Sequence, residues 1–270
     1  MSARLAAAAR RAAAATGFLH PRWWLPTLVA LAAAAVVWTL VARSNPYVLP
    51  ALGAVGEQLT TQPGFYVENA AATLREALLG LLAGSVAAFA LAVGISESTV
   101  LRRALLPLVV VLNVTPVVAI APALVVAFGF GILPKVVVTA LITFFPVLMN
   151  TTTGLRSVAR PVLQVFRTVH ASRLDVLWRL RIPSALPYVF ASLRVVFPLS
   201  IVGAIVAEFS AAGATQGLGT VISVASSSSQ LDRVFAAIAC LAVMGSVLLL
   251  LVTAVERRVL SWHESQSGPS

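Results

Sequence analysis

Runs of about 20 apolar residues constrain this chain more than any other feature of its sequence. A helix of that length crosses a bilayer, because each residue adds about 1.5 Å and the hydrocarbon core is about 30 Å thick. Of the 270 residues, 59% are hydrophobic and 10% are charged, which leaves room only for short loops between such helices. The sequence therefore predicts an all-α membrane protein with six transmembrane helices, and it excludes a soluble enzyme or a secreted disulfide-bonded scaffold. The six runs lie at about 24–43, 72–95, 104–128, 133–152, 187–209 and 234–255.

Positive charge is distributed unequally among the segments that flank these runs. Most of the 19 Lys and Arg residues precede the first run, follow the sixth, or lie between runs two and three or four and five. An excess of Lys and Arg marks cytoplasmic loops. We therefore expect a multi-pass membrane protein with both termini in the cytoplasm. The alternate segments hold or adjoin only Arg43, Arg75, Lys135 and Arg233, and Arg194 lies near the start of the fifth run.

The arrangement of runs divides the chain into three regions. We expect residues 1–22 to be a basic cytoplasmic tail, residues 23–258 to form the six-helix domain, and residues 259–270 to be a second cytoplasmic tail. The first run is longer than the apolar part of a signal peptide and has no clear cleavage site after it, which favours an uncleaved span. The first tail either forms a basic amphipathic helix on anionic lipid or is a frayed end.

Motifs of enzymatic chemistry are absent from the sequence. It has no H-E-x-x-H or G-x-S-x-G motif and no cluster of Cys and His, so we expect neither a metal site nor an intramembrane protease. A P-loop needs a Gly-Lys-Ser/Thr run, whereas the only lysine, Lys135, follows Pro134. We therefore expect no enzyme and no cofactor in this chain, and the formal charge of +10 reflects its loops rather than a nucleic-acid partner. Uphill transport would take its energy from a partner chain or from an ion gradient.

The segment 153–187 is unusually long and basic for a loop of such a protein. It carries six arginines, and its apolar residues recur at helical spacing. Ser172 followed three positions later by Asp175 is a capping-box pattern, so a helix is expected to begin near Ser172 and to end at Pro183 and Pro187. The pattern predicts two short amphipathic helices. Periodicity alone is equally consistent with docking into a groove of another protein and with resting on the membrane surface.

The same segment resembles a known signature. Ala171 to Leu174, Leu180 to Pro183 and Ala185 to Pro187 are similar to the cytoplasmic loop of binding-protein-dependent ABC transporter permeases, particularly the nitrate/taurine/alkanesulfonate type. The family's pattern is E-A-A, three residues, G, nine residues and I-x-L-P. Further similarities, in order and at comparable spacing, cover about residues 45–258. They include Thr73-Leu74-Arg75, Pro122 with Phe128-Gly129, Phe144-Phe145-Pro146, Leu193-Arg194, Ala207-Glu208 and Gly217-Leu218-Gly219.

The resemblance implies an import system of five parts in the bacterial plasma (inner) membrane. Two permease chains, identical or different, form the pathway, a dimer of cytoplasmic ATPases binds ATP and Mg²⁺, and an extracytoplasmic binding protein delivers the solute. The segment at about 160–183 would dock on the ATPase. The sequence departs from the signature where Gln164 replaces its acid and His170 its glycine, and a turn with positive φ is costlier for His. The implied coupling residues are Gln164, Val165, Phe166, Val169, His170, Ala171, Ser172, Arg173, Leu174, Asp175, Leu177, Trp178, Leu180 and Pro183.

Few polar residues lie inside the runs. Glu208 is the only acid expected well inside one, and it is either a gate or pathway residue or the partner of Arg233 or Lys135 in a structural ion pair. Arg194 lies about 21 Å from it along the helix and is expected to extend toward the cytoplasm. The segment Gly213–Ser229 is expected to be a solvated loop, although the resemblance implies a short external helix. The other pathway candidates, each of which could instead form an interhelical hydrogen bond, are Asn113, Thr115, Asn150 and Ser200.

The most consistent interpretation is the permease subunit of an ATP-driven importer. Its solute would be small and polar or organic, of the sulfonate, nitrate or bicarbonate, pyrimidine or flavin-like class that the resemblance implies. An ion-gradient-driven secondary transporter or a channel is the alternative, although such transporters often contain internal repeats and none is evident here. A scaffold subunit without a pathway is the weakest interpretation, because an intramembrane acid and broken helices are costly without a cavity.

Overall fold

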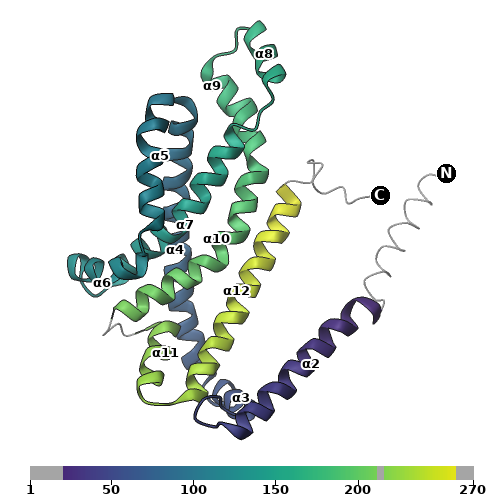
Figure 1. The fold of residues 1–270 in the computed structure, drawn as a ribbon, viewed down its shortest axis with the longest axis vertical. Coiled ribbons are helices and arrows are strands. Elements are labelled where there is room, and N and C mark those ends of the chain that lie inside the picture. Colours follow the sequence, from purple (N-terminus) through teal and green to yellow (C-terminus); the bar gives the residue numbers. More distant parts are fainter. Residues whose placement is uncertain (1–20, 212–215, 260–270) are drawn as a thin grey trace, which may run out of the picture.

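The computed structural model describes residues 21–211 and 216–259, and the side chains from residue 25 onward. Most of the two predicted tails, 1–22 and 259–270, and positions 212–215 of the predicted loop Gly213–Ser229 lie outside the described residues. The described parts are helical, which confirms the predicted all-α class (Figure 1). The elements are α2 (Pro21–Ser44), α3 (Leu52–Thr61), α4 (Pro63–Glu97), α5 (Thr99–Val114), α6 (Val117–Phe128), α7 (Ile132–Leu155), α8 (Arg160–Thr168), α9 (Arg173–Val176), the π-helical η1 (Leu177–Arg181), α10 (Ile182–Ser210), α11 (Leu218–Ser227) and α12 (Leu231–Val259).

Five helices in the described part are long and apolar enough to cross a membrane, and a sixth span is formed if α5 and α6 are taken together. These two helices meet at an angle of 94°. Pro116 explains the break, because proline cannot donate the helical hydrogen bond and disfavours helical geometry at the residue before it, Thr115. The backbone of Thr115 is extended, with ψ of 124°. The predicted third run, 104–128, is therefore broken in its middle.

The bundle is built on close packing among α4, α7 and α10. Gly80 and Gly84 of α4 lie against α7, and Gly203 of α10 lies against the same stretch of α7. A Cβ atom at Gly84 would stand 2.5 Å from the carbonyl oxygen of Ala140, so only glycine allows this approach. Small residues bring helix backbones together in membranes, where apolar burial alone gives little drive for association. This packing fixes the register of the three helices that carry the buried polar residues described below.

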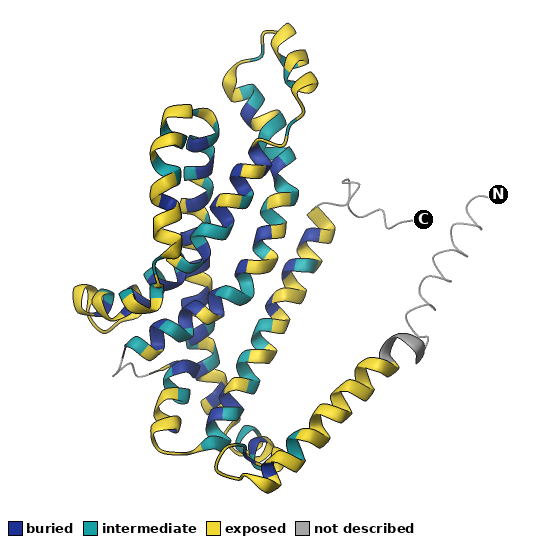
Figure 2. Ribbon diagram, in the orientation of Figure 1, coloured by how far each residue is buried: buried dark blue, intermediate teal, exposed yellow. Residues whose placement is uncertain are grey.

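Helix α2 diverges from the bundle and is exposed along most of its length (Figures 1 and 2). Its described contacts are at its C-terminal end. There the indole of Trp38 donates a hydrogen bond of 3.0 Å to the carbonyl of Pro50, and its ring meets Phe235 of α12 edge to face at 5.1 Å. The helix is thus attached at the end of the bundle that carries α3 and α11.

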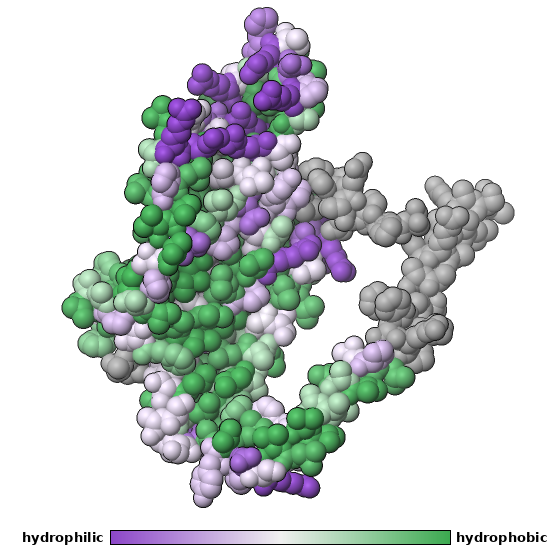
Figure 3. All heavy atoms as spheres, viewed as in Figure 1, coloured by the Kyte–Doolittle hydropathy of each residue, from purple (hydrophilic) through white to green (hydrophobic). Residues whose placement is uncertain are grey.

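The two ends of the bundle differ in character. Charged side chains gather at the end that carries α8 and α9, whereas apolar side chains cover the middle (Figure 3). Near the charged end Arg181 forms an ion pair with Glu97, and Arg194 of α10 forms one with Glu256 of α12. Arg194 was expected to extend toward the cytoplasm, and sequence reasoning did not foresee that Glu256 near the C-terminal end of α12 lies within its reach.

Pro183 and Pro187 do not end the helix that begins after Ser172, contrary to the sequence-based expectation. Helices α9, η1 and α10 form one continuous helical stretch from Arg173 to Ser210. Pro183 lies just after the π-helical turn, whose wider hydrogen-bond spacing relieves the contact between a proline ring and the preceding turn. Packing of α10 against α7 holds the remainder of the helix together. The predicted second short helix is therefore the beginning of a membrane-spanning helix.

Candidate functional site

A hairpin formed by α8, the turn at His170 and α9 projects from the charged end of the bundle (Figure 1). Its turn depends on His170, whose φ is +52°, so histidine does adopt the positive φ for which the signature has glycine. The turn is closed by backbone hydrogen bonds from His170 N–H to Arg167 and from Ala171 N–H to Phe166, each 3.0 Å long. The local cost of positive φ is therefore offset within a well-bonded turn.

The predicted capping box is confirmed at the start of α9. The Ser172 hydroxyl accepts a hydrogen bond of 3.1 Å from Asp175 N–H, and the Asp175 carboxylate accepts one of 3.3 Å from Ser172 N–H. Hydrogen bonds from Ser172 lower the pKa of Asp175 below its usual range. A lowered pKa means that the stabilising charge is present at neutral pH and is lost only as pH falls through the pKa in the folded state. The carboxylate that caps α9 is therefore ionised at physiological pH.

The hairpin exposes apolar side chains, although not all of the predicted ones. Val165, Val169, Leu174 and Trp178 are each more than 60% exposed. Leu177 instead is buried in the core. The prediction that it contacts a docking partner is therefore wrong, because its side chain is not at the surface. The remaining predicted positions are partly or largely exposed, and they are Gln164, Phe166, His170, Ala171, Ser172, Arg173, Asp175, Leu180 and Pro183.

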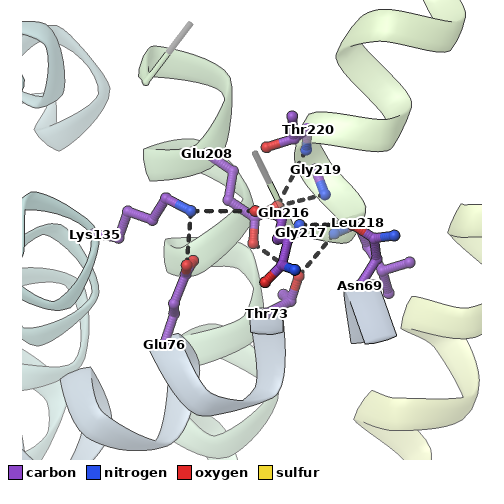
Figure 4. Close-up of polar contacts among 10 residues, drawn as sticks. All are labelled: Asn69, Thr73, Glu76, Lys135, Glu208, Gln216, Gly217, Leu218, Gly219 and Thr220. Carbon is purple, nitrogen blue, oxygen red and sulfur yellow. Dashed lines mark hydrogen bonds and ion pairs between the residues drawn. The ribbon is translucent and has the colours of Figure 1, made fainter. Parts of the chain in front are cut away.

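A second group of polar residues is buried toward the α11 end of the bundle (Figure 4). The Glu208 carboxylate, 2% exposed, accepts hydrogen bonds from the Thr73 hydroxyl at 2.7 Å and from the backbone N–H groups of Gly219 at 2.5 Å and Thr220 at 3.2 Å. It is therefore the anchor of the segment that begins α11. The predicted ion pair with Arg233 or Lys135 is not formed in the described structure, because backbone donors and Thr73 occupy the carboxylate instead.

Two residues of α4 complete this anchor. Asn69 Oδ1 accepts a hydrogen bond of 2.9 Å from Gly217 N–H, and the Thr73 hydroxyl accepts one of 2.8 Å from Leu218 N–H. The first N–H groups of a helix have no partner within the helix, and here side chains of α4 and α10 bind all four of them. Gly217 has φ of +131°, and a Cβ atom there would overlap the Glu208 carboxylate. The helix α11 replaces much of the loop expected at Gly213–Ser229.

The expectation that Glu208 is the only acid inside a span is wrong. Glu76 of α4 and Lys135 of α7 are each 5% exposed, and Lys135 Nζ lies 2.6 Å from Glu76 Oε1. The same ammonium is 3.4 Å from the carbonyl oxygen of Gln216. Sequence reasoning considered Lys135 only as a partner of Glu208 and Thr73 only as part of the resemblance, and it missed Glu76 and Asn69. The sequence signal for this ion pair was the position of Glu76 and Lys135, two opposite charges that each lie just inside an apolar run.

Removing one partner of this ion pair should destabilise the protein. Lys135→Met leaves Glu76 as an unpaired buried charge, which is expected to lower the free energy of unfolding by about 3–5 kcal/mol. Adding Glu76→Gln should restore much of the loss, because no isolated charge then remains. Thermal unfolding of the purified variants in one detergent measures both effects. A double variant less stable than Lys135→Met would contradict this account.

The other predicted pathway residues do not join the Glu208 group. The side chains of Thr115, Asn150 and Ser200 donate to carbonyls of their own helices, at Val111, Pro146 and Phe197, over 2.7–2.9 Å. These three residues therefore form neither a shared site nor an interhelical hydrogen bond in the described structure. Asn113 is exposed on α5. Among the described residues no group of three His, Cys, Asp or Glu side chains could hold a metal ion.

Comparison with known proteins gives consistent matches. A family model described as the binding-protein-dependent transport system inner membrane component matches residues 80–261. The formylaminopyrimidine transport permease protein ThiX of Halalkalibacterium halodurans is 33% identical over 234 residues, covering 86% of this chain and 93% of that protein. The riboflavin transport system permease protein RibX of Chloroflexus aurantiacus is 36% identical over 165 residues, 61% of each chain. The taurine transport system permease protein TauC of Escherichia coli is 30% identical over 243 residues, 86% of this chain and 88% of that protein.

Proposed function

Because the chain belongs to the family of binding-protein-dependent transport system inner membrane components, we propose that it is the permease subunit of an ATP-driven ABC importer. The family consists of transport subunits rather than enzymes, so ATP and Mg²⁺ would bind to a partner ATPase. The charge distribution supports a topology with both termini in the cytoplasm, which puts the α8–α9 hairpin on the cytoplasmic side. The α3 and α11 end would then face the external solute-binding protein.

The observation that carries this proposal is the projecting hairpin. Four apolar side chains are exposed on it beyond the apolar middle of the bundle, where neither core nor lipid tails would cover them. Apolar residues surrounded by arginines on a rigid hairpin suit a groove on another protein. Gln164, Val165, Phe166, Val169, His170, Leu174 and Trp178 would contact the ATPase, whereas Leu177 would support the hairpin from the core.

The solute class follows from the relatives and remains broad. Relatives of this chain are named for transport of formylaminopyrimidine, riboflavin and taurine. These compounds are small, polar or organic, and rich in hydrogen-bonding groups. We therefore propose a solute of this kind, delivered by a separate binding protein, and a pathway formed with a second permease chain, identical or different.

One feature favours a second candidate function. Buried ionisable residues inside spans often belong to ion-coupled transporters, and Glu76 and Lys135 form such a pair. An ion-gradient-driven transporter would need no ATPase, and this difference separates the two functions.

Purification of the full chain from its own cells in a mild detergent tests the proposal. We expect mass spectrometry to identify a P-loop ATPase in equal or double stoichiometry, together with a second permease if the pathway is formed by two different chains. An unrelated membrane protein of similar abundance, purified in the same way, is the control for carry-over. Recovery of the chain with no ATPase, together with solute uptake that follows an ion gradient, would favour the secondary transporter.

A further inference from the structure

Two buried carboxyl groups lie together in the polar group shown in Figure 4, and one of their oxygens lacks a donor. Glu76 is 5% exposed and Glu208 is 2% exposed. Their carboxyl groups lie within hydrogen-bonding reach of each other. Glu76 Oε2 is buried and accepts no hydrogen bond in the described structure. An ionised carboxylate can only accept hydrogen bonds, so two ionised groups in this position could not satisfy that oxygen.

The donors around Glu208 are all used by Glu208 itself. Its Oε1 accepts the only O–H proton of Thr73 over 2.7 Å, and its Oε2 accepts the N–H groups of Gly219 and Thr220. No hydrogen of these groups remains for Glu76 Oε2. The described neighbours therefore leave one buried acceptor facing another.

The charges of this group do not balance if both carboxyl groups are ionised. Lys135 is the ammonium of the group, and its Nζ lies 2.6 Å from Glu76 Oε1. Helix α11 contributes no titratable side chain. The other charged side chains at this end of α4 and α12 line open pockets or bind α3, and they are Glu68, Arg75, Asp232 and Arg233. Two carboxylates against one ammonium leave one negative charge inside the bundle, and a buried charge without a partner is costly.

We propose that Glu76 and Glu208 hold one proton between them, which forms a hydrogen bond from one carboxyl group to the other. A protonated carboxyl group has one O–H donor, so the proton satisfies Glu76 Oε2 whether it is bonded to that oxygen or to Glu208. Such a proton belongs to the pair rather than to either residue. Together with Lys135 the group is then neutral, whereas in Lys135→Met the pair carries an uncompensated negative charge. This proton site lies beyond the proposed importer function and does not depend on it.

The proton would hold the start of α11 in place. Glu208 accepts the first N–H groups of that helix, and loss of the proton would leave two carboxylates repelling each other at the anchor. The anchored state therefore binds one proton more than a state in which α11 has moved away. Linkage then makes the anchor strongest at low pH and weaker as pH rises through the titration of the pair. One linked proton changes the opening equilibrium by up to about tenfold per pH unit.

Glu76→Gln is the test variant, because it removes the proton and keeps the net charge of the group. Its amide supplies a permanent N–H donor toward Glu208, and the charges of Lys135 and Glu208 balance. We therefore expect the full chain with this change to fold. Glu256→Gln is the matched control, since Glu256 is another buried acid, bound to Arg194 near the other end of the bundle.

Infrared spectroscopy detects the proton directly. A protonated carboxyl group has a C=O stretching band that is separate from the bands of carboxylates and amides. With the chain in a maltoside detergent, which has no carbonyl group, we expect wild type to show this band at neutral pH and to lose it as the pH is raised. The band should be absent from Glu76→Gln and present in Glu256→Gln.

Hydrogen exchange of α11 measures the effect on the anchor. Exchange at residues 217–227 is compared between wild type and Glu76→Gln at each pH, so that the pH dependence of the exchange chemistry cancels. We expect the ratio of the two rates to rise by up to about tenfold per pH unit above the titration of the pair, because only wild type loses a proton there. The ratio for α8, at the far end of the bundle, should stay constant.

Absence of the acid band from wild type, or a band that survives Glu76→Gln, would overturn the proposal. A Glu76→Gln chain that does not fold, or an exchange ratio of α11 that does not change with pH, would do the same. Neither measurement requires an ATPase or a solute, so a failure here would leave the proposed importer function standing. Failure to recover an ATPase would conversely leave the proton site intact.

Discussion

Replacing Glu208 with alanine is expected to remove most of the folded protein. The change leaves the Thr73 hydroxyl and the N–H groups of Gly219 and Thr220 without their buried acceptor. Each of these three unsatisfied buried donors costs about 1–3 kcal/mol, so the total loss is about 3–9 kcal/mol. Domains of this size unfold with about 5–15 kcal/mol, so the loss is a large part of the whole.

Size-exclusion chromatography of a fluorescent fusion, with the melting temperature of the recovered fraction, measures this effect. Glu57→Ala is the matched control, because Glu57 is an exposed acid on α3 without a side-chain partner in the described structure. Gly217→Ala should act in the same direction as Glu208→Ala, since its Cβ atom would overlap the carboxylate. A Glu208→Ala chain that melts like the Glu57→Ala chain would show that Glu208 is not the anchor.

The double variant Leu174→Glu, Trp178→Glu is expected to lose ATPase binding while remaining folded. Both side chains are 67% exposed, so two added charges change the hairpin surface and not the core. Truncation of a central interface residue commonly costs about 2 kcal/mol or more, so two such losses predict a fall in affinity of at least about 100-fold. Uptake of solute by cells that carry the variant should fall with it.

Co-purification of the ATPase and the melting temperature of the variant are the two measurements. Val100→Glu is the control, because Val100 is a 79% exposed apolar residue of α5 outside the hairpin. Leu177→Glu should behave differently from both, since Leu177 is buried and an unpaired charge there destabilises the bundle. Normal ATPase recovery with Leu174→Glu, Trp178→Glu would refute the proposed docking surface.

The features that were predicted correctly depend on residues that are close together in the sequence. Apolar runs of spanning length determine the helices, and the capping box at Ser172 and Asp175 involves residues three positions apart. At His170 a positive φ was expected to be costlier than for the signature glycine, and the histidine nevertheless adopts φ of +52°. Such features need no knowledge of which helices are neighbours.

The contacts within the buried polar group could not be predicted, because they depend on helix register. Lys135 and Glu76 are 59 positions apart, and Thr73 and Glu208 are 135 apart. Rotating α4 by one residue would turn its polar side chains about 100° away from α7 and α10. The close approach at Gly80, Gly84 and Gly203 sets that rotation. The spacing of Gly80 and Gly84 indicates a packing face on α4, but it does not reveal which helices that face meets.

Because α9, η1 and α10 are continuous, the whole stretch can tilt as one rod. Leu174 stands near one end and Glu208 near the other, roughly 50 Å apart at about 1.5 Å per residue. A tilt of only about 5° about one end would displace the other by about 4 Å, more than the length of a hydrogen bond. Pro187 and Pro198 lie inside α10, and this stretch nevertheless remains one unbroken helix. A displacement of the hairpin would therefore be transmitted to the anchor of α11 through one continuous helix backbone.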